Sequence, residues 1–207
     1  MLVGITGGIG SGKSTLARLL AQRGAVLVDA DYLGHQILEI PRVVAELVGA
    51  FGAQITDPCG RIRRRELGRL AFAGPEAFAQ LSRIVRPHLE ALLWQEIARA
   101  ADSSADALVI VDAALLYEWG VAERFDLMIA VDAPEDVRRR RAAARQGLSE
   151  AEVERRMAWQ MPAREKAARA DLVVENGGNL ADLEQRAAEV WQRIVDDQLE
   201  RRSGHEP

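Results

Sequence analysis

A glycine-rich segment near the start of the chain carries the residue types that bind nucleotide phosphates. Gly7 to Ser14 fits the pattern G-x-x-x-x-G-K-[ST], between a β-type apolar run at residues 2–6 and a helical pattern at residues 14–22. Glycines let consecutive backbone N–H groups turn toward phosphate oxygens, and a helix N-terminus adds a partial positive charge. The segment therefore predicts a phosphate-binding loop. Its predicted backbone cradle consists of Gly8, Ile9, Gly10, Ser11 and Gly12.

The residues that close this loop predict what it does with a nucleotide. We expect Lys13 to reach the β- and γ-phosphates of ATP as a catalytic point charge, and Ser14 to offer its hydroxyl to Mg²⁺. The hydroxyl and N–H of Thr15 are expected to help hold a phosphate. The dinucleotide pattern G-x-G-x-x-G is not found in Gly7 to Ser14, which disfavours hydride transfer. We therefore predict that the protein requires Mg²⁺ and uses ATP as a co-substrate.

Aspartates that follow apolar runs are the candidates for proton transfer and metal binding. Asp29 and Asp31 follow the run at residues 25–28, and in an extended stretch their spacing puts both carboxylates on one side. Asp31 is predicted to orient or deprotonate a hydroxyl, and Asp29 to support Mg²⁺. Asp112 follows the run at residues 107–111 and is a second Mg²⁺ candidate. For each of these residues a helix-cap or turn role is the alternative.

Arginine clusters suggest further anion contacts. Arg138 to Arg141 cover every face of a helix, so only one or two of them can face the same phosphates. Arg141 and Arg145 are one helical turn apart and are predicted to close over ATP together, with a solvated surface as the alternative for the rest. A second cluster, which contacts either an acidic acceptor or solvent, follows Gly60. It comprises Arg61, Arg63, Arg64 and Arg65.

Composition limits the classes of function. The formal charge of the 207-residue chain is -4, which gives little support to nucleic-acid binding. Cys59 is the only cysteine, which fits a reducing compartment, and no apolar run is long enough to span a bilayer. The three histidines lack metal-ligand spacing. We therefore expect a cytoplasmic protein that binds neither membrane nor nucleic acid.

Apolar patterning predicts an α/β fold with a parallel sheet core. Strand-like runs alternate with helical patterns, as in βαβ units, and the stretch from residue 32 to about residue 99 reads as a helical insertion. We expect the insertion to be broken at its prolines and glycine turns. The expected strands cover residues 2–6, 25–28, 107–111, 127–131 and 172–175. The expected breaks lie at Pro41, Asp57 to Gly60, Gly74–Pro75 and Pro87.

Over nearly its whole length the chain resembles the dephospho-CoA kinases, a family of P-loop kinases. The order and the spacing of the matching segments both agree with the family pattern. The segments are Thr6 to Thr15, Val28 to Asp31, Phe51–Gly52 with Gly60 and Arg64, Leu115 to Glu118, Gly147 to Ser149, Gln160, Lys166, Ala170–Asp171 and Asn176–Gly177.

The resemblance implies a three-layer α/β/α P-loop fold that transfers phosphate from ATP to the ribose 3′-hydroxyl of dephospho-CoA, giving CoA and ADP. It implies a core of about residues 1–31, 101–135 and 169–200. A helical acceptor-binding insertion covers about residues 32–100, and a lid covers about residues 136–168. Closure of the lid would exclude water and suppress ATP hydrolysis.

The resemblance also implies roles for single residues. Asp31 is the implied general base, and Arg141 and Arg145 are implied to close over ATP. No obligate protein partner is implied. The remaining implied contacts are Asn176 to ATP, and Asp31, His35, Arg64 and Leu115 to the acceptor.

Several residues depart from the family pattern. Arg86–Pro87 stands where a His-Pro pair is usual, Ala114 where a proline precedes the Leu-Leu pair, and His35 where arginine is common. These differences affect the acceptor side of the site. Another small-metabolite, nucleoside or nucleotide kinase is the alternative function, and a nucleotide-driven switch is disfavoured because no Asn-Lys-x-Asp segment is found.

Overall fold

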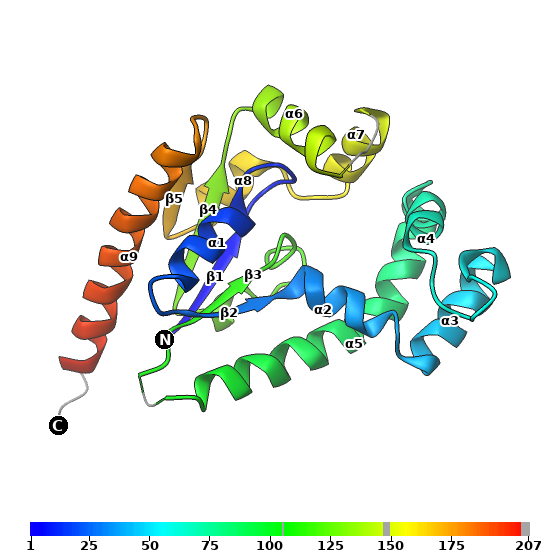
Figure 1. Ribbon diagram of the computed structural model, residues 1–207, viewed down its shortest axis with the longest axis horizontal. Helices are drawn as coiled ribbons and strands as arrows, with labels where there is room; N and C mark the ends of the chain where they lie inside the picture. The colour runs from blue at the N-terminus through cyan, green and yellow to red at the C-terminus, as the bar shows by residue number, and fades with distance from the viewer. Residues whose placement is uncertain (105, 147–149, 204–207) are drawn as a thin grey trace. The chain divides into compact units, whose positions relative to one another are not determined.

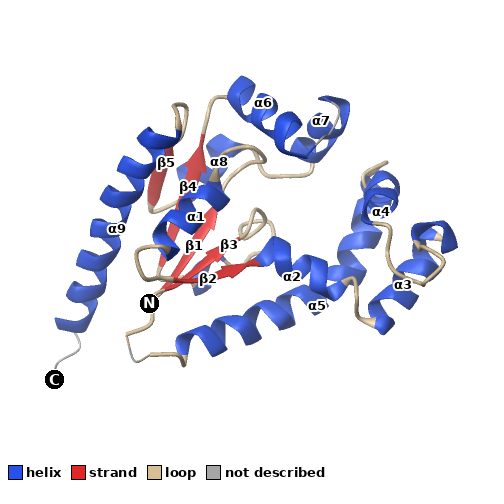
Figure 2. Cartoon of the chain, in the orientation of Figure 1, coloured by secondary structure: helices blue, strands red, loops and turns tan. Residues whose placement is uncertain are grey.

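The computed structural model describes residues 1–104, 106–146 and 150–203 of the chain. The turn expected at residues 147–149 lies outside these ranges. Figures 1 and 2 show a sheet flanked by helices. The strands are β1 (Leu2–Thr6), β2 (Val26–Asp29), β3 (Val109–Asp112), β4 (Leu127–Asp132) and β5 (Leu172–Glu175). The helices are α1 (Lys13–Ala21), α2 (Ala30–Ile37), α3 (Pro41–Phe51), α4 (Arg64–Ala71), α5 (Pro75–Ala101), α6 (Glu135–Gln146), α7 (Glu150–Ala158), α8 (Ala163–Arg169) and α9 (Leu180–Ser203).

The sheet places β1 at its centre. The strand order is β2-β3-β1-β4-β5, and β1 pairs in parallel with β3 on one side and with β4 on the other. In this register Ile5 lies opposite Asp112 of β3 and Ile129 of β4. Because parallel strands end at the same edge, the loops after β1, β3 and β4 all leave the sheet together. The α/β fold class predicted from the sequence is confirmed.

The alternation of side chains along β1 creates the layers. Val3 and Ile5 are fully buried in a core cluster with Leu16 of α1 and Ile194 of α9, so these two helices cover one face of the sheet. The Cβ position of Gly4 points to the opposite face of the sheet, where a Cβ atom would meet Leu116, Phe125 and Met128. Helix α8 packs against β4. The architecture is therefore three-layered.

Residues Asp29–Ala98 form a compact helical unit, separate from the unit made of Met1–Val28 and Arg99–Pro207. The helical unit has a core of its own, built from Val43 and Leu47 of α3 with Leu67 of α4. The finer boundaries of the insertion and the lid given above remain predictions. No helix in the described ranges is both long enough and apolar enough to cross a membrane.

One expected helix break is wrong. Helix α5 continues from Pro75 to Ala101 through Pro87, which Figure 1 shows as one continuous element. A proline inside a helix removes one hydrogen bond to the carbonyl four residues earlier, here that of Arg83. Pro87 and Arg83 are both exposed, so a carbonyl that loses its helical donor here is open to solvent and the helix can continue.

The sheet core provides a stability prediction. Leu16 is fully buried between α1 and the sheet. We expect Leu16→Ala to lower the free energy of unfolding by about 2–5 kcal/mol, because it removes apolar contacts and leaves a cavity. Leu180→Ala, at a position that is 58% exposed, is the matched control and should change it by less than about 0.5 kcal/mol. Guanidinium unfolding curves measure both, and equal effects would contradict this assignment of the core.

Candidate functional site

The predicted phosphate loop joins the central strand to the first helix. Strand β1 ends at Thr6 and α1 begins at Lys13. Between them Gly10 has φ +77° and Gly12 has φ +96°, a left-handed backbone that favours glycine. The first helical turn of α1 follows the loop directly, so its N-terminal N–H groups face the end of the loop.

The same glycines also allow close packing around the loop. A Cβ atom at Gly10 would collide with the backbone oxygen of Arg138 in α6, and one at Gly12 would collide with the side-chain amide of Asn176. The Asn176 Nδ2 donates to the Ser11 carbonyl at 2.8 Å. The loop is thus fixed from outside by α6 and by the segment after β5.

Some backbone N–H groups of the loop have hydrogen-bond acceptors within the described structure, and others do not. Ser11 donates its N–H to the Gly8 carbonyl at 3.0 Å, and Ile9 donates to Gln160 Oε1 at 3.0 Å. No acceptor is found within the described ranges for the N–H groups of Gly10, Gly12 and Ser14. Open donors beside a helix N-terminus are what an anionic phosphate group binds.

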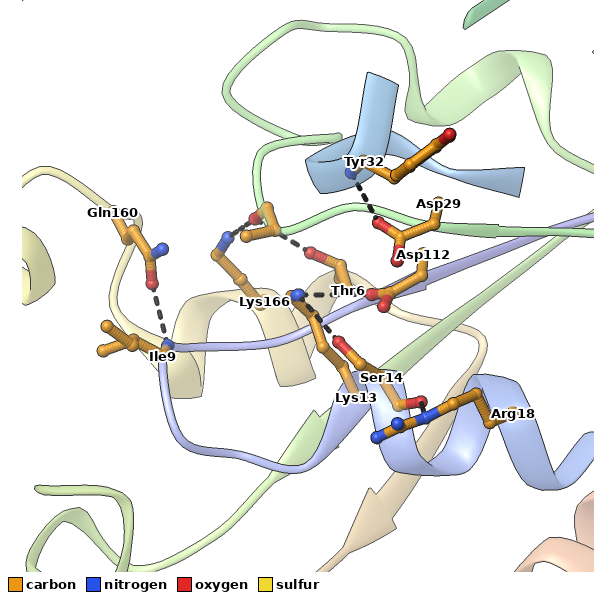
Figure 3. Close-up of polar contacts among 11 residues, drawn as sticks. Thr6, Ile9, Lys13, Ser14, Arg18, Asp29, Tyr32, Asp112, Gln160 and Lys166 are labelled. Atoms are coloured by element: carbon orange, nitrogen blue, oxygen red, sulfur yellow. Dashed lines mark hydrogen bonds and ion pairs between the residues drawn. The ribbon is translucent and has the colours of Figure 1, made fainter. Parts of the chain in front are cut away.

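Lys13 provides the positive charge of the site. Its Nζ lies 3.2 Å from Asp112 Oδ1 and 3.4 Å from Ser14 Oγ, as the dashed lines in Figure 3 show. The side chains of Lys13 and Asp112 are only 11% and 2% exposed. The structure therefore brings together three of the residues that the sequence singled out.

The position of Asp112 follows from the strand order. Strand β3 lies between β1 and β2, so the strand that ends in Asp29 is not the direct neighbour of β1. Asp112 is consequently the carboxylate at the end of the adjacent strand. Pairing between distant segments decides this order, which a local pattern of apolar residues cannot reveal.

The expected geometry of Asp29 and Asp31 is also wrong. They do not share one extended stretch, because β2 ends at Asp29 and α2 begins at Ala30. Asp29 Oδ1 accepts the N–H of Tyr32 at 3.0 Å and caps α2, which is the alternative role raised above (Figure 3). Asp31 lies exposed in the first turn of α2. The metal role of Asp29 and the base role of Asp31 remain predictions.

Arg141 and Asn176 lie together beside the loop. Arg141 donates to the backbone carbonyls of Asn176 at 2.7 Å and Gly178 at 2.6 Å. Since Asn176 also binds Ser11, Asn176 links Arg141 of α6 to the phosphate loop. Arg145 belongs to α6, but its side chain lies outside the described part of the structure.

The predicted acceptor residues come from three separate segments of the chain. His35 is exposed near the end of α2, and Arg64 is exposed at the start of α4. Leu115 is half-buried in the segment after β3. Their acceptor roles, like the phosphate contact proposed for Thr15, remain predictions.

Arg138 is a site residue that the sequence reading did not single out. It is 8% exposed, and its Nε donates to the Ala133 carbonyl at 3.0 Å. One of its terminal nitrogens would lie 2.7 Å from a Cβ atom at Gly8. Its position in a run of four arginines gave no local signal, because helical spacing alone cannot tell which arginine faces the loop.

Three further residues, Gln160, Lys166 and Glu118, were matched only as parts of a family pattern. Gln160 binds the N–H of Ile9, and Lys166 is fully buried beside Glu118. Burial lowers the pKa of Lys166, and the Glu118 carboxylate opposes that shift. A lysine in a charged helical block usually indicates an exposed face, so the sequence alone suggests the wrong environment for Lys166.

A cavity of about 1040 Å³ lies at the ends of β4 and β5, but it does not have the charge of a phosphate site. Acidic and basic residues alternate around it, and Arg139 pairs with Glu135 at 2.7 Å and with Glu154 at 3.5 Å. In these pairs the two glutamates offset the positive charge of Arg139. The positive charge and open N–H groups are concentrated instead at the loop from Gly7 to Ser14.

The loop region fits a magnesium ion that also binds nucleotide phosphates. The Ser14 hydroxyl and the Asp112 carboxylate are hard oxygen donors, and Lys13 lies within 3.4 Å of both. Within the described ranges, no group of three or more His, Cys, Asp or Glu residues could hold a metal ion. A magnesium ion at this site would therefore take most of its ligands from phosphates and water.

Comparison with known proteins agrees with this geometry. A dephospho-CoA kinase of Anaeromyxobacter dehalogenans is 44% identical over 178 residues, which cover 86% of this chain and 84% of that protein. A dephospho-CoA kinase of Thermobifida fusca is 37% identical over 193 residues, covering 93% and 95% of the two chains. The crystal structure of TT1252 from Thermus thermophilus superimposes with a TM-score of 0.76 at 39% identity, covering 94% of this chain and 97% of the other.

The family model for CoaE, dephospho-CoA kinase, matches residues 1–182, which include the phosphate loop, Asp112, Arg138, Gln160 and Asn176. The chain belongs to the dephospho-CoA kinase family.

Proposed function

We propose that this protein transfers the γ-phosphoryl group of ATP to the ribose 3′-hydroxyl of dephospho-CoA, giving CoA and ADP in the final step of coenzyme A synthesis. The observation that carries the proposal is the buried contact of Lys13 with Asp112 and Ser14 at the end of a loop with open N–H groups. Membership of the dephospho-CoA kinase family supplies the substrate class.

The loop binds and orients the nucleotide in this proposal. The open N–H groups of Gly10, Gly12 and Ser14 donate hydrogen bonds to the phosphate oxygens, and Lys13 turns from Asp112 toward the β- and γ-phosphates. Negative charge that builds on the transferring group is stabilised by this ammonium. Asn176 and Arg141 support the loop, since Asn176 donates to the Ser11 carbonyl and Arg141 donates to the Asn176 carbonyl.

Magnesium is the proposed metal. Ser14 would hold it directly and Asp112 would bind its water ligands, while Asp29 is a weaker candidate because its Oδ1 already caps α2. When bound, the ion neutralises phosphate charge and orients the triphosphate. Displacement of Lys13 by the phosphates frees the Asp112 carboxylate for this role.

The acceptor side requires a base and an anion-binding surface. The ribose hydroxyl oxygen attacks the γ-phosphorus, the bond to the β-phosphate oxygen breaks, and the hydroxyl proton passes to Asp31. His35, Arg64 and Leu115 are proposed to hold the acceptor. Arg145 is proposed to join Arg141 over ATP when the lid closes.

A cytoplasmic location is part of the proposal. Cys59 is exposed and free, which a reducing compartment preserves. Both substrates are small molecules, and the proposed reaction needs no protein partner.

A substrate panel tests the proposed function. Purified protein with Mg²⁺ and ATP should form ADP with dephospho-CoA and show little turnover with nucleoside monophosphates, shikimate or gluconate. ADP formed only with a nucleoside monophosphate would show that dephospho-CoA is not the acceptor.

The role of Lys13 gives a mutational prediction. Lys13→Met should reduce kcat by about 100-fold or more, because it removes charge stabilisation of the transferring phosphoryl group. Arg193→Met, which removes an exposed cation on α9, should leave kcat unchanged. Initial-rate measurements of ADP release compare the two. Near-normal turnover of Lys13→Met would show that the loop is not the catalytic site.

The role of Asp31 gives a second prediction. Asp31→Asn keeps the shape of the side chain but removes the base, so kcat should fall by about 10²- to 10⁴-fold while the Kd of ATP changes little. Asp196→Asn, at an exposed position of α9, is the matched control. Steady-state kinetics and calorimetric titration with ATP measure the two quantities. An unchanged kcat would remove Asp31 from the mechanism.

A further inference from the structure

A fully buried lysine lies outside the phosphate loop and has no part in the mechanism above. Lys166 of α8 has 0% exposure. Its Nζ donates to the backbone carbonyl of Ala114 and lies 2.8 Å from Glu118 Oε1. Burying an ammonium group is costly unless it is paired and hydrogen-bonded, so these two partners account for its burial.

The Ala114 carbonyl connects Lys166 to the start of the phosphate loop. It also accepts the hydroxyl of Thr6 at 3.1 Å, and Thr6 is the last residue of β1, directly before Gly7. In Figure 3 the dashed lines from Thr6 and Lys166 run to one unlabelled residue, which these two hydrogen bonds identify as Ala114. One acceptor therefore joins β1, the segment after β3 and helix α8.

Glu118 is shared in the same way. Its Oε1 accepts both the Lys166 ammonium and the N–H of Met161, the latter at 2.7 Å. The preceding residue, Gln160, accepts the N–H of Ile9 in the phosphate loop. Residues 160–166, which we name the strap, thus contact the phosphate loop at one end and residues 114–118 along their length.

Lys166 is held away from direct contact with a nucleotide. Its side chain has no exposed surface, and both of its polar neighbours belong to residues 114–118. The Lys13 charge is near enough to add to the lowering of the pKa of Lys166 that burial causes. The Glu118 carboxylate compensates the second positive charge, so of the two lysines Lys13, which contacts Ser14, is the one placed to meet the phosphates.

We propose that Lys166 is a positioning residue that, through Glu118 and the Ala114 carbonyl, holds residues 114–118 in register with the phosphate loop for phosphoryl transfer. The inference rests on the proposed function, because it takes the loop as the site of transfer. Leu115, a proposed acceptor contact, lies within the segment that Lys166 holds. Loss of Lys166 would therefore misalign the acceptor side while leaving the loop itself intact.

The main test compares kcat with nucleotide affinity in Lys166→Met. We expect kcat with dephospho-CoA to fall by about tenfold or more, since small misplacement of reacting groups is costly, while the Kd of Mg·ATP changes by less than about threefold. Arg42→Met, which breaks an exposed pair with Glu46 on α3, is the matched control and should change neither. Unchanged kcat, or an equal loss of ATP affinity, would overturn the proposal.

A second variant guards against misfolding of Lys166→Met. Glu118→Gln keeps the shape and an acceptor oxygen for Met161 but removes the negative charge, so kcat should fall in the same direction with ATP affinity retained. The double variant Lys166→Met/Glu118→Gln should lose no more than Lys166→Met alone, because both changes break one contact. Additive losses, or normal kcat in folded Glu118→Gln, would contradict action through Glu118.

Hydrogen exchange separates this inference from the proposed function. Peptides that cover residues 113–120 should exchange faster in Glu118→Gln and Lys166→Met than in the parent protein, whichever acceptor is phosphorylated. Unchanged exchange in this segment would overturn the positioning role. Absence of activity with dephospho-CoA in the parent protein would instead contradict the proposed function.

Discussion

The buried positive charge of Lys13, at the start of α1, determines how the rest of the site is built. Lys13 is nearly inaccessible to water and has the Asp112 carboxylate 3.2 Å away. An ammonium in this position must have an anionic partner, and the open N–H groups of the adjacent loop favour a phosphate as that partner. The fold thus builds an anion site and supplies one carboxylate to compensate its charge.

Contacts from several elements hold the phosphate loop in place. Arg138 and Asn176 occupy the space that side chains at Gly10 and Gly12 would need, so the glycines permit contact with α6 and with the segment after β5. The strap, residues 160–166, binds the loop through Gln160. A loop fixed by such contacts is already arranged for phosphate and loses little conformational entropy on binding.

The sequence allowed accurate prediction where local chemistry decides the structure, and failed where distant contacts decide it. Gly7 to Ser14 required a particular loop, and its place between strand and helix is confirmed. Pro87 suggested a break, but an exposed position lets α5 continue. Asp112 lies beside β1 because β3 inserts next to it, and Lys166 is buried because Glu118 meets it from another segment. Neither fact is encoded in spacing along the chain.

The fate of the transferred phosphoryl group is the most direct test of the proposed reaction. ³¹P NMR of a reaction that contains the protein, Mg²⁺, ATP and dephospho-CoA can follow ADP and the new phosphate ester at the same time. We expect a ribose 3′-phosphomonoester that forms in the same amount as ADP. Inorganic phosphate formed with ADP, or an ester at another position of the acceptor, would contradict it.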